Sequence, residues 1–139
     1  MKIVVASHGA FCHGLVESYK MIAGDNSDIY AVSLTDEGIG EFSRELSKLV
    51  DKLILEDDIL IMTDIQGGTP YNESLKYMLD KPENIKVISG MNLPMLIEIG
   101  LALNNDMEID QLVNRAVEIG RKSINVANID IDDEDDLDL

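Results

Sequence analysis

The stretch KIVVASHG, residues 2–9, decides the fold because it predicts a strand that ends in a turn at a histidine. Its first five residues are mostly apolar and β-branched, which is typical of an inner strand. Apolar side chains then recur at helical spacing over residues 11–22, up to a glycine that ends the helix. The chain therefore begins with a strand, a turn and a helix.

The same alternation continues along the sequence. Apolar runs typical of strands occur at residues 29–34, 58–62 and 85–89, and apolar residues at helical spacing follow each of them. A last amphipathic helix is predicted over residues 108–122. Alternating strands and helices form parallel sheets with right-handed crossovers. We therefore predict an α/β fold with an open, mainly parallel sheet of about four strands and helices on both faces.

The C-terminal residues divide into two segments. Residues 123–131 alternate apolar and polar side chains, so we expect a C-terminal edge strand there. Residues 130–139 hold seven of the 27 acidic residues, and we expect a disordered tail because its apolar area is too small to offset the entropy lost on ordering. The predicted organisation is one domain at residues 1–129 and an acidic tail at 130–139.

Composition excludes several classes of protein. A chain of 139 residues with 45% hydrophobic content suits one domain with a buried core. Its net charge of −16 argues against nucleic-acid binding, since phosphate contacts need clustered Lys and Arg. The single Cys12 cannot form an internal disulfide, and no signal peptide or membrane-spanning apolar run is evident. We therefore expect a cytoplasmic protein.

His8 is the strongest candidate for chemistry because open parallel sheets bind ligands at the carboxyl ends of their strands. Histidine titrates near neutral pH, and the helix that follows His8 has N-terminal amides that can hold an anion. Asp64, at the end of the third predicted strand, can orient one ring nitrogen of His8 and leave the other to attack phosphorus. The alternatives are that His8 only hydrogen-bonds within its loop and that Asp64 only caps its turn.

Two further loops are predicted at the same rim. The loop GGTP, residues 67–70, offers backbone amides and a hydroxyl to a phosphate, although a plain glycine turn is equally consistent with it. It lacks the GxxxxGK[ST] pattern, so nucleoside triphosphate chemistry is not predicted. The loop GMNLP, residues 90–94, ends the fourth predicted strand. His13 is interpreted as a helix-surface residue of secondary interest.

Three motifs occur together: SHG at residues 7–9, DIQGGTPYN at 64–72 and GMNLPML at 90–96. With them the sequence resembles the IIA component of mannose-family sugar phosphotransferase systems over residues 1–125. The resemblance implies that His8 receives a phosphoryl group from the carrier HPr and passes it to a histidine of a IIB component. It also implies that the protein acts indirectly with the membrane components IIC and IID and needs no metal or other cofactor. Finally, it implies a homodimer with exchanged C-terminal strands.

The predicted site follows from these motifs and this resemblance. The catalytic candidates are His8, Asp64 and Thr69; the phosphate-binding candidates are Gly9, Gly67 and Gly68; the partner and groove candidates are Pro70, Asn72, Met91, Asn92 and Pro94. Three alternative functions stay open. They are the phosphocarrier subunit of a dihydroxyacetone kinase, a receiver-like domain phosphorylated on Asp64, and a regulatory module that never transfers phosphate. A receiver predicts an acidic pair near the first strand end, where this chain has Ser7 and His8.

Overall fold

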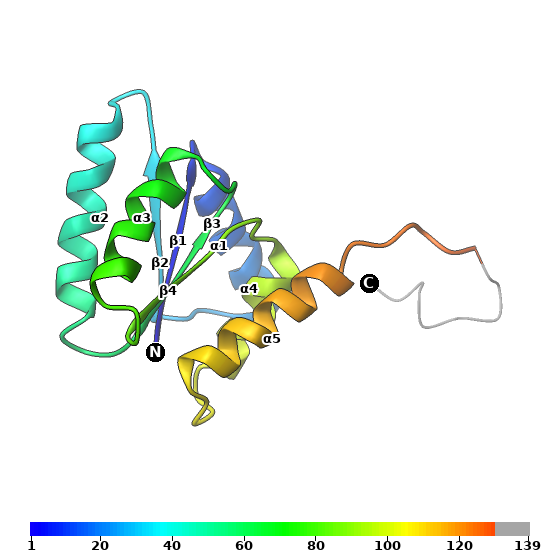
Figure 1. Ribbon diagram of the computed structural model, residues 1–139. Helices are drawn as coiled ribbons and strands as arrows, with labels where there is room; N and C mark the ends of the chain where they lie inside the picture. Colours follow the sequence, from blue (N-terminus) through cyan, green and yellow to red (C-terminus); the bar gives the residue numbers. More distant parts are fainter. Residues whose placement is uncertain (130–139) are drawn as a thin grey trace.

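The computed structural model describes residues 1–129, in which four parallel strands form one open sheet in the order β2-β1-β3-β4 (Figure 1). In chain order the elements are β1 (Lys2–His8), α1 (Phe11–Ala23), β2 (Ile29–Leu34), α2 (Ile39–Leu53), β3 (Ile59–Thr63), α3 (Thr69–Asp80), β4 (Ile85–Ile88), α4 (Leu93–Ala102) and α5 (Ile109–Lys122). This architecture confirms the predicted α/β fold with its parallel sheet.

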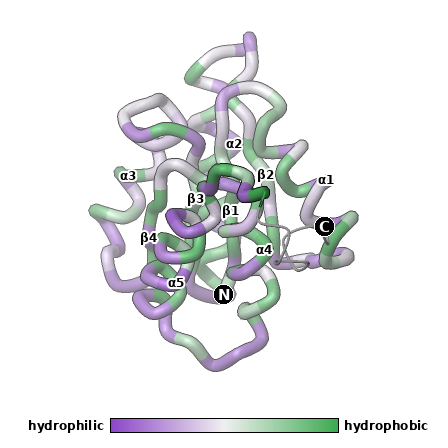
Figure 2. Tube along the Cα trace, turned by 90° about the vertical axis from the view of Figure 1, so that its right-hand side faces the viewer, coloured by the Kyte–Doolittle hydropathy of each residue, from purple (hydrophilic) through white to green (hydrophobic). Residues whose placement is uncertain are grey.

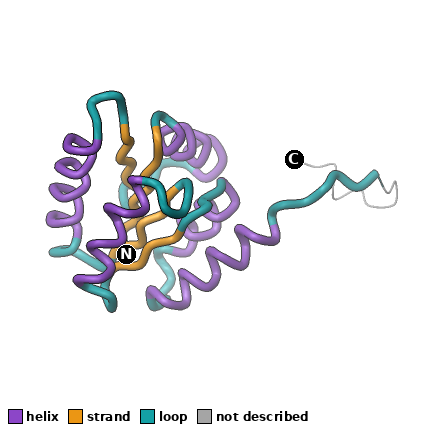
Figure 3. The backbone as a smooth tube through the Cα atoms, turned by 45° about the horizontal axis from the view of Figure 1, so that its top comes forward, coloured by secondary structure: helices purple, strands orange, loops and turns teal. Residues whose placement is uncertain are grey.

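Helices cover both faces of the sheet, as predicted (Figures 1 and 3). Alternation along β1 explains the two layers, because successive side chains of a strand point to opposite faces. Ile3 and Val5 pack with α1, α4 and α5, whereas Val4 and Ala6 pack with α2 and α3. None of the helices within residues 1–129 is long and apolar enough to cross a bilayer.

The two inner strands carry the most buried part of the chain. Every residue of β3 is buried, and β1 is buried from Ile3 to Ser7. The hydrophobic residues accordingly gather on the strands in Figure 2, with hydrophilic ones towards the outer turns. Burial of this apolar area from water is the main favourable contribution to folding. In the register of the inner pair Ala6 lies opposite Thr63, so the residues that follow both strands meet at one rim.

The C-terminal segment differs from its prediction. Residues 123–129 form no strand, and they leave the body of the domain beyond α5 (Figures 1 and 3). Their large apolar side chains are exposed: Ile124 is 79% exposed, Val126 93% and Ile129 91%. An alternating pattern specifies the two faces of a strand but not the edge that it pairs with, and residues 123–129 pair with neither outer edge of the sheet. The predicted acidic tail, 130–139, lies outside the described residues.

Candidate functional site

His8 and Asp64 lie side by side at the carboxyl ends of the inner strands. His8 is the last residue of β1, and Asp64 directly follows β3. The Asp64 Oδ2 accepts a hydrogen bond from the His8 backbone N–H at 2.8 Å and lies 2.8 Å from the Nδ1 atom of the same residue. The imidazole side chain is 50% exposed, but the carboxylate is only 17% exposed. One carboxylate therefore fixes both the backbone and the ring of His8.

The hydrogen bonds around Asp64 decide its charge. Burial raises the pKa of the carboxyl group, but bonds from the His8 backbone, the His8 ring and the Ile65 amide outweigh burial and hold that pKa below its usual value. An ionised Asp64 accepts a proton-bearing Nδ1, which leaves Nε2 of His8 with its lone pair. Both carboxylate oxygens are engaged, Oδ1 by Ile65 and Oδ2 by His8, and this disfavours Asp64 as a phosphoryl acceptor.

Gly68 lies against the ring of His8. A Cβ atom at Gly68 would lie 2.8 Å from Cε1 and 3.5 Å from Nε2 of His8, so only glycine permits this approach. The preceding Gly67 has φ +81°, which also favours glycine. Gly68 is the N-cap of α3, so the start of α3 stands beside the ring. Amides in the first turn of a helix lack partners within the helix and favour an anion.

The residues that follow Gly68 hold this loop together. The Asn72 side-chain amide donates to the Gly67 carbonyl at 3.0 Å, which ties the first turn of α3 back to the loop. Pro70 is buried in that turn, where a missing N–H costs nothing. Thr69 opens the helix. The structure thus brings His8, Asp64, Gly68 and the start of α3 into one site.

A hollow of about 490 Å³ opens on the other side of His8, towards β2. Its lining residues come from the turn after β1, from the start of α1 and from the end of β2: His8, Gly9, Ala10, His13, Ser33, Leu34, Thr35 and Asp36. The His13 Nε2 lies 3.2 Å from the Ser33 Oγ, so the second histidine belongs to the wall of the hollow. Sequence reasoning gave His13 only a secondary place, because its contact with Ser33 joins two separate elements.

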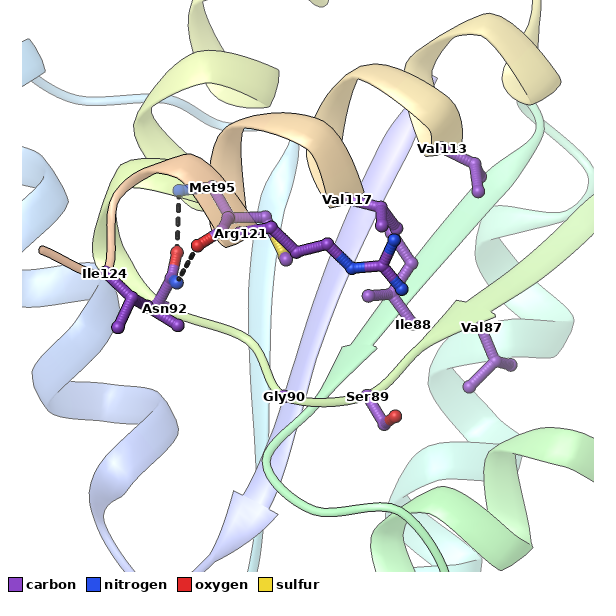
Figure 4. Close-up of a pocket in the computed structure, with 11 residues that line it drawn as sticks. Val87, Ile88, Ser89, Gly90, Asn92, Met95, Val113, Val117, Arg121 and Ile124 are labelled. Atoms are coloured by element: carbon purple, nitrogen blue, oxygen red, sulfur yellow. Dashed lines mark hydrogen bonds between the residues drawn. The ribbon is translucent and has the colours of Figure 1, made fainter.

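The loop after β4 lies apart from His8, since β3 stands between β4 and β1. Met91 is buried, and its amide donates to the Thr63 carbonyl at 3.0 Å. Asn92 caps α4 by accepting from the Met95 amide at 3.1 Å, and it donates to the Gly120 carbonyl of α5 at 3.0 Å (Figure 4). These contacts are structural. The role of Met91, Asn92 and the exposed Pro94 towards a partner stays a prediction.

Asn92 also lines a separate groove of about 330 Å³ between β4 and α5 (Figure 4). The groove lies along the outer edge of β4, where Val87 and Ser89 meet Val117 and Arg121. Within residues 1–129, no cluster of three or more His, Cys, Asp or Glu side chains is arranged to hold a metal ion.

This fold and this site define a class of protein. Its members are open α/β domains with a hydrogen-bonded histidine at the carboxyl end of an inner strand. The sequence profile of one known family, described as PTS system fructose IIA component, matches residues 2–117. The chain belongs to this family of IIA components of sugar phosphotransferase systems (PTS), which confirms the resemblance found in the sequence.

Individual relatives agree with this assignment. The PTS system mannose-specific EIIAB component of Escherichia coli strain K12 is 30% identical over 123 residues, and the match covers 88% of this chain but only 38% of that protein. The PTS system sorbose-specific EIIA component of Lacticaseibacillus casei is 31% identical over 125 residues, 86% of this chain and 85% of that protein. The crystal structure of phosphotransferase system component EIIA from Streptococcus agalactiae has a TM-score of 0.81 at 30% identity, covering 90% of this chain and 95% of that one.

Proposed function

We propose that this protein carries a phosphoryl group on Nε2 of His8, taken from phospho-HPr and passed to a histidine of a IIB component during sugar uptake. The observation that carries the proposal is the contact of Asp64 Oδ2 with both the backbone N–H and Nδ1 of His8, at 2.8 Å each. This contact leaves Nε2 as the ring atom available for attack. We place the exchange in the cytoplasm, as the family resemblance implies.

The residues of the site fit the transfer step. The Nε2 lone pair of His8 attacks phosphorus, the N–P bond of the donor histidine breaks, and its electron pair returns to the donor ring. Asp64 accepts the Nδ1–H and stabilises the positive charge that develops on the His8 ring. We assign the amides at the start of α3, with the Thr69 hydroxyl and the loop glycines Gly67 and Gly68, to the phosphoryl oxygens. The Gly9 amide, predicted to bind phosphate, already donates to the Leu34 carbonyl at 2.7 Å, so we assign Gly9, with φ +57°, to the shape of the turn beside His8.

The surface around His8 also suits transient partners. Phe11 is 51% exposed at the start of α1, and Ile65 is 58% exposed directly after Asp64. Exposed apolar residues beside a reactive group are typical of docking surfaces. Because the same nitrogen receives and delivers the phosphoryl group, we propose that HPr and the IIB component dock here in turn.

Incubation with phosphoenolpyruvate, enzyme I and HPr tests the proposal, with the modified residue mapped by mass spectrometry. We expect an acid-labile, alkali-stable phosphate on His8 that His8→Ala abolishes, and a ³¹P NMR signal of the Nε2-phosphohistidine type. Phosphate on Asp64, or none under conditions that phosphorylate another IIA component, would refute the carrier function. Phosphorylation by HPr without delivery to any IIB component would instead favour the dihydroxyacetone kinase alternative.

We further propose the homodimer with exchanged C-terminal strands that the family resemblance implies. Two observations support it: the outer edge of β4 pairs with no strand of the described residues, and the segment beyond α5 exposes Ile124, Val126 and Ile129. The groove beside β4 lies along that unpaired edge (Figure 4). Light scattering should give a dimer mass for the full chain and a monomer mass for a chain ending at Ser123. A monomeric full chain would contradict this arrangement.

A further inference from the structure

The site around His8 is short of positive charge. The segments that leave the carboxyl ends of the four strands, residues 8–14, 33–40, 63–72 and 89–95, contain no Lys or Arg. Of the basic side chains on the helices, Arg44 forms an ion pair with Glu41, and Arg121 lines the separate groove beside β4. The phosphoryl group would therefore meet no lysine or arginine from the strand-end loops of this chain.

Negative charge, by contrast, lies on both sides of His8. Asp64 contacts its Nδ1, and Asp36 lines the hollow on the β2 side. A phosphoryl group spreads its charge over three oxygens, and its transfer depends on positioning and on electrostatic stabilisation. Two carboxylates near such a group raise its energy unless a cation offsets them. A positive group is therefore expected on the side of the His8 ring that faces the hollow.

His13 is the one residue besides His8 that can supply this charge from the lining of the hollow. Its position near the start of α1 places it on the hollow that His8 also lines, and the Ser33 hydroxyl at 3.2 Å from Nε2 holds the ring there. Histidine gains a proton near neutral pH, and its imidazolium form donates from both nitrogens.

We propose that protonated His13 is this chain's own positive contact for the phosphoryl group on His8, where it stabilises the phosphorylated state. The inference rests on the proposed carrier function. It predicts that the phosphorylated state becomes less favourable when the positive charge at position 13 is removed.

Other ionisable groups near His13 do not replace it. Glu17 lies one turn further along α1, and Asp36 faces the same hollow, but both are acids. The adjacent helix α4 has one charged residue, Glu98, which forms an ion pair with Arg115. His8 itself is the carrier. Only His13 among these neighbours can carry a positive charge without bearing the phosphoryl group.

The experiment measures the equilibrium between phospho-HPr and the phosphorylated protein for the wild type and for His13→Gln. Glutamine can still hydrogen-bond to Ser33 but is never charged. Loss of one charge-assisted contact should lower the equilibrium constant about tenfold at about pH 6 and leave it nearly unchanged at about pH 8.5. The ratio of variant to wild type at each pH cancels the pH dependence of HPr.

Two further variants separate charge from structure. His13→Lys keeps a positive charge at both pH values and should restore most of the loss at the lower pH. Lys20→Gln removes one positive charge from the far end of α1 and should change nothing. Equal equilibria for His13→Gln and the wild type at both pH values would overturn the inference, as would equal losses in His13→Gln and His13→Lys. A wild type that never accepts phosphate on His8 would refute the carrier function itself.

Discussion

His8 has two unlike sides. Towards β3 the ring is held by the contact of Nδ1 with Asp64, and Gly68 lies so near that an added Cβ atom would clash with Cε1. Towards β2 it borders an open hollow of about 490 Å³, whose wall carries His13 on Ser33. A carrier of a reactive group needs both properties, because its nucleophile must be fixed and the group that it carries must remain accessible. The β3 side supplies the fixed geometry, and the β2 side supplies the access.

The largest loss of transfer rate is expected when the contact between Asp64 and the His8 ring is removed. Asp64→Asn removes the charge that sets the Nδ1 proton and the ring orientation, so the rate of phosphorylation by phospho-HPr should fall about 100-fold. Rapid-quench measurements of single transfers would give this rate. Asp36→Asn is the matched control, since it removes an exposed carboxylate from the open side. An equal loss in both variants would show that overall charge, not ring orientation, is responsible.

A smaller loss of transfer rate is expected when a side chain is added beside the His8 ring on the β3 side. Gly68→Ala adds a Cβ atom 2.8 Å from His8 Cε1 and 3.1 Å from Ile65 Cγ2, so the ring or the loop must shift. We expect about a tenfold slower transfer, since a displaced nucleophile loses part of its alignment, with little change in thermal stability.

Gly14→Ala is the matched control for this substitution. Gly14 lies within α1, and a Cβ atom there would meet nothing within 4 Å. Alanine should stabilise the helix by about 0.5–1 kcal/mol and leave the rate unaltered. If Gly68→Ala transfers as fast as the wild type, the close packing of the loop against His8 has no functional role.

The contrast between the two sides also separates what sequence can predict from what it cannot. The strands were predictable because each is a mostly apolar run bounded by turn residues, and most helices because apolar residues recur along them at helical spacing. His8 and Asp64 could be paired in advance, because parallel strands bring their carboxyl ends to the same rim. The predicted strand at residues 123–131 had the correct alternation, but its described part, residues 123–129, pairs with neither outer edge of the sheet.

Contacts between distant elements could not be predicted in this way. The partner of His13 lies 20 residues away on β2, and the Gly120 partner of Asn92 lies 28 residues away on α5. Sequence spacing gives the face on which a side chain lies, but the choice among the possible partners depends on how helices pack on the sheet. The GGTP loop suggested amides for a phosphate, and only the structure shows Gly68 pressed against the His8 ring.

The smallest expected effect is on the free energy of unfolding, and it tests whether the β3 side of His8 depends on the charge of Asp64. The hydrogen bonds around Asp64 hold its pKa below the ordinary value despite burial, so its ionised form stabilises the folded state. This contribution is fully present above about pH 4, the ordinary range of an aspartate carboxyl group, and is lost as pH falls through the lowered pKa. Urea unfolding at pH values between neutral and strongly acidic would measure it.

The wild type should exceed Asp64→Asn in stability at neutral pH, and the two should converge in acid. A difference that persists at the lowest pH would mean that Asp64 stabilises the rim through packing, so that the fixed side of His8 would not depend on its charge.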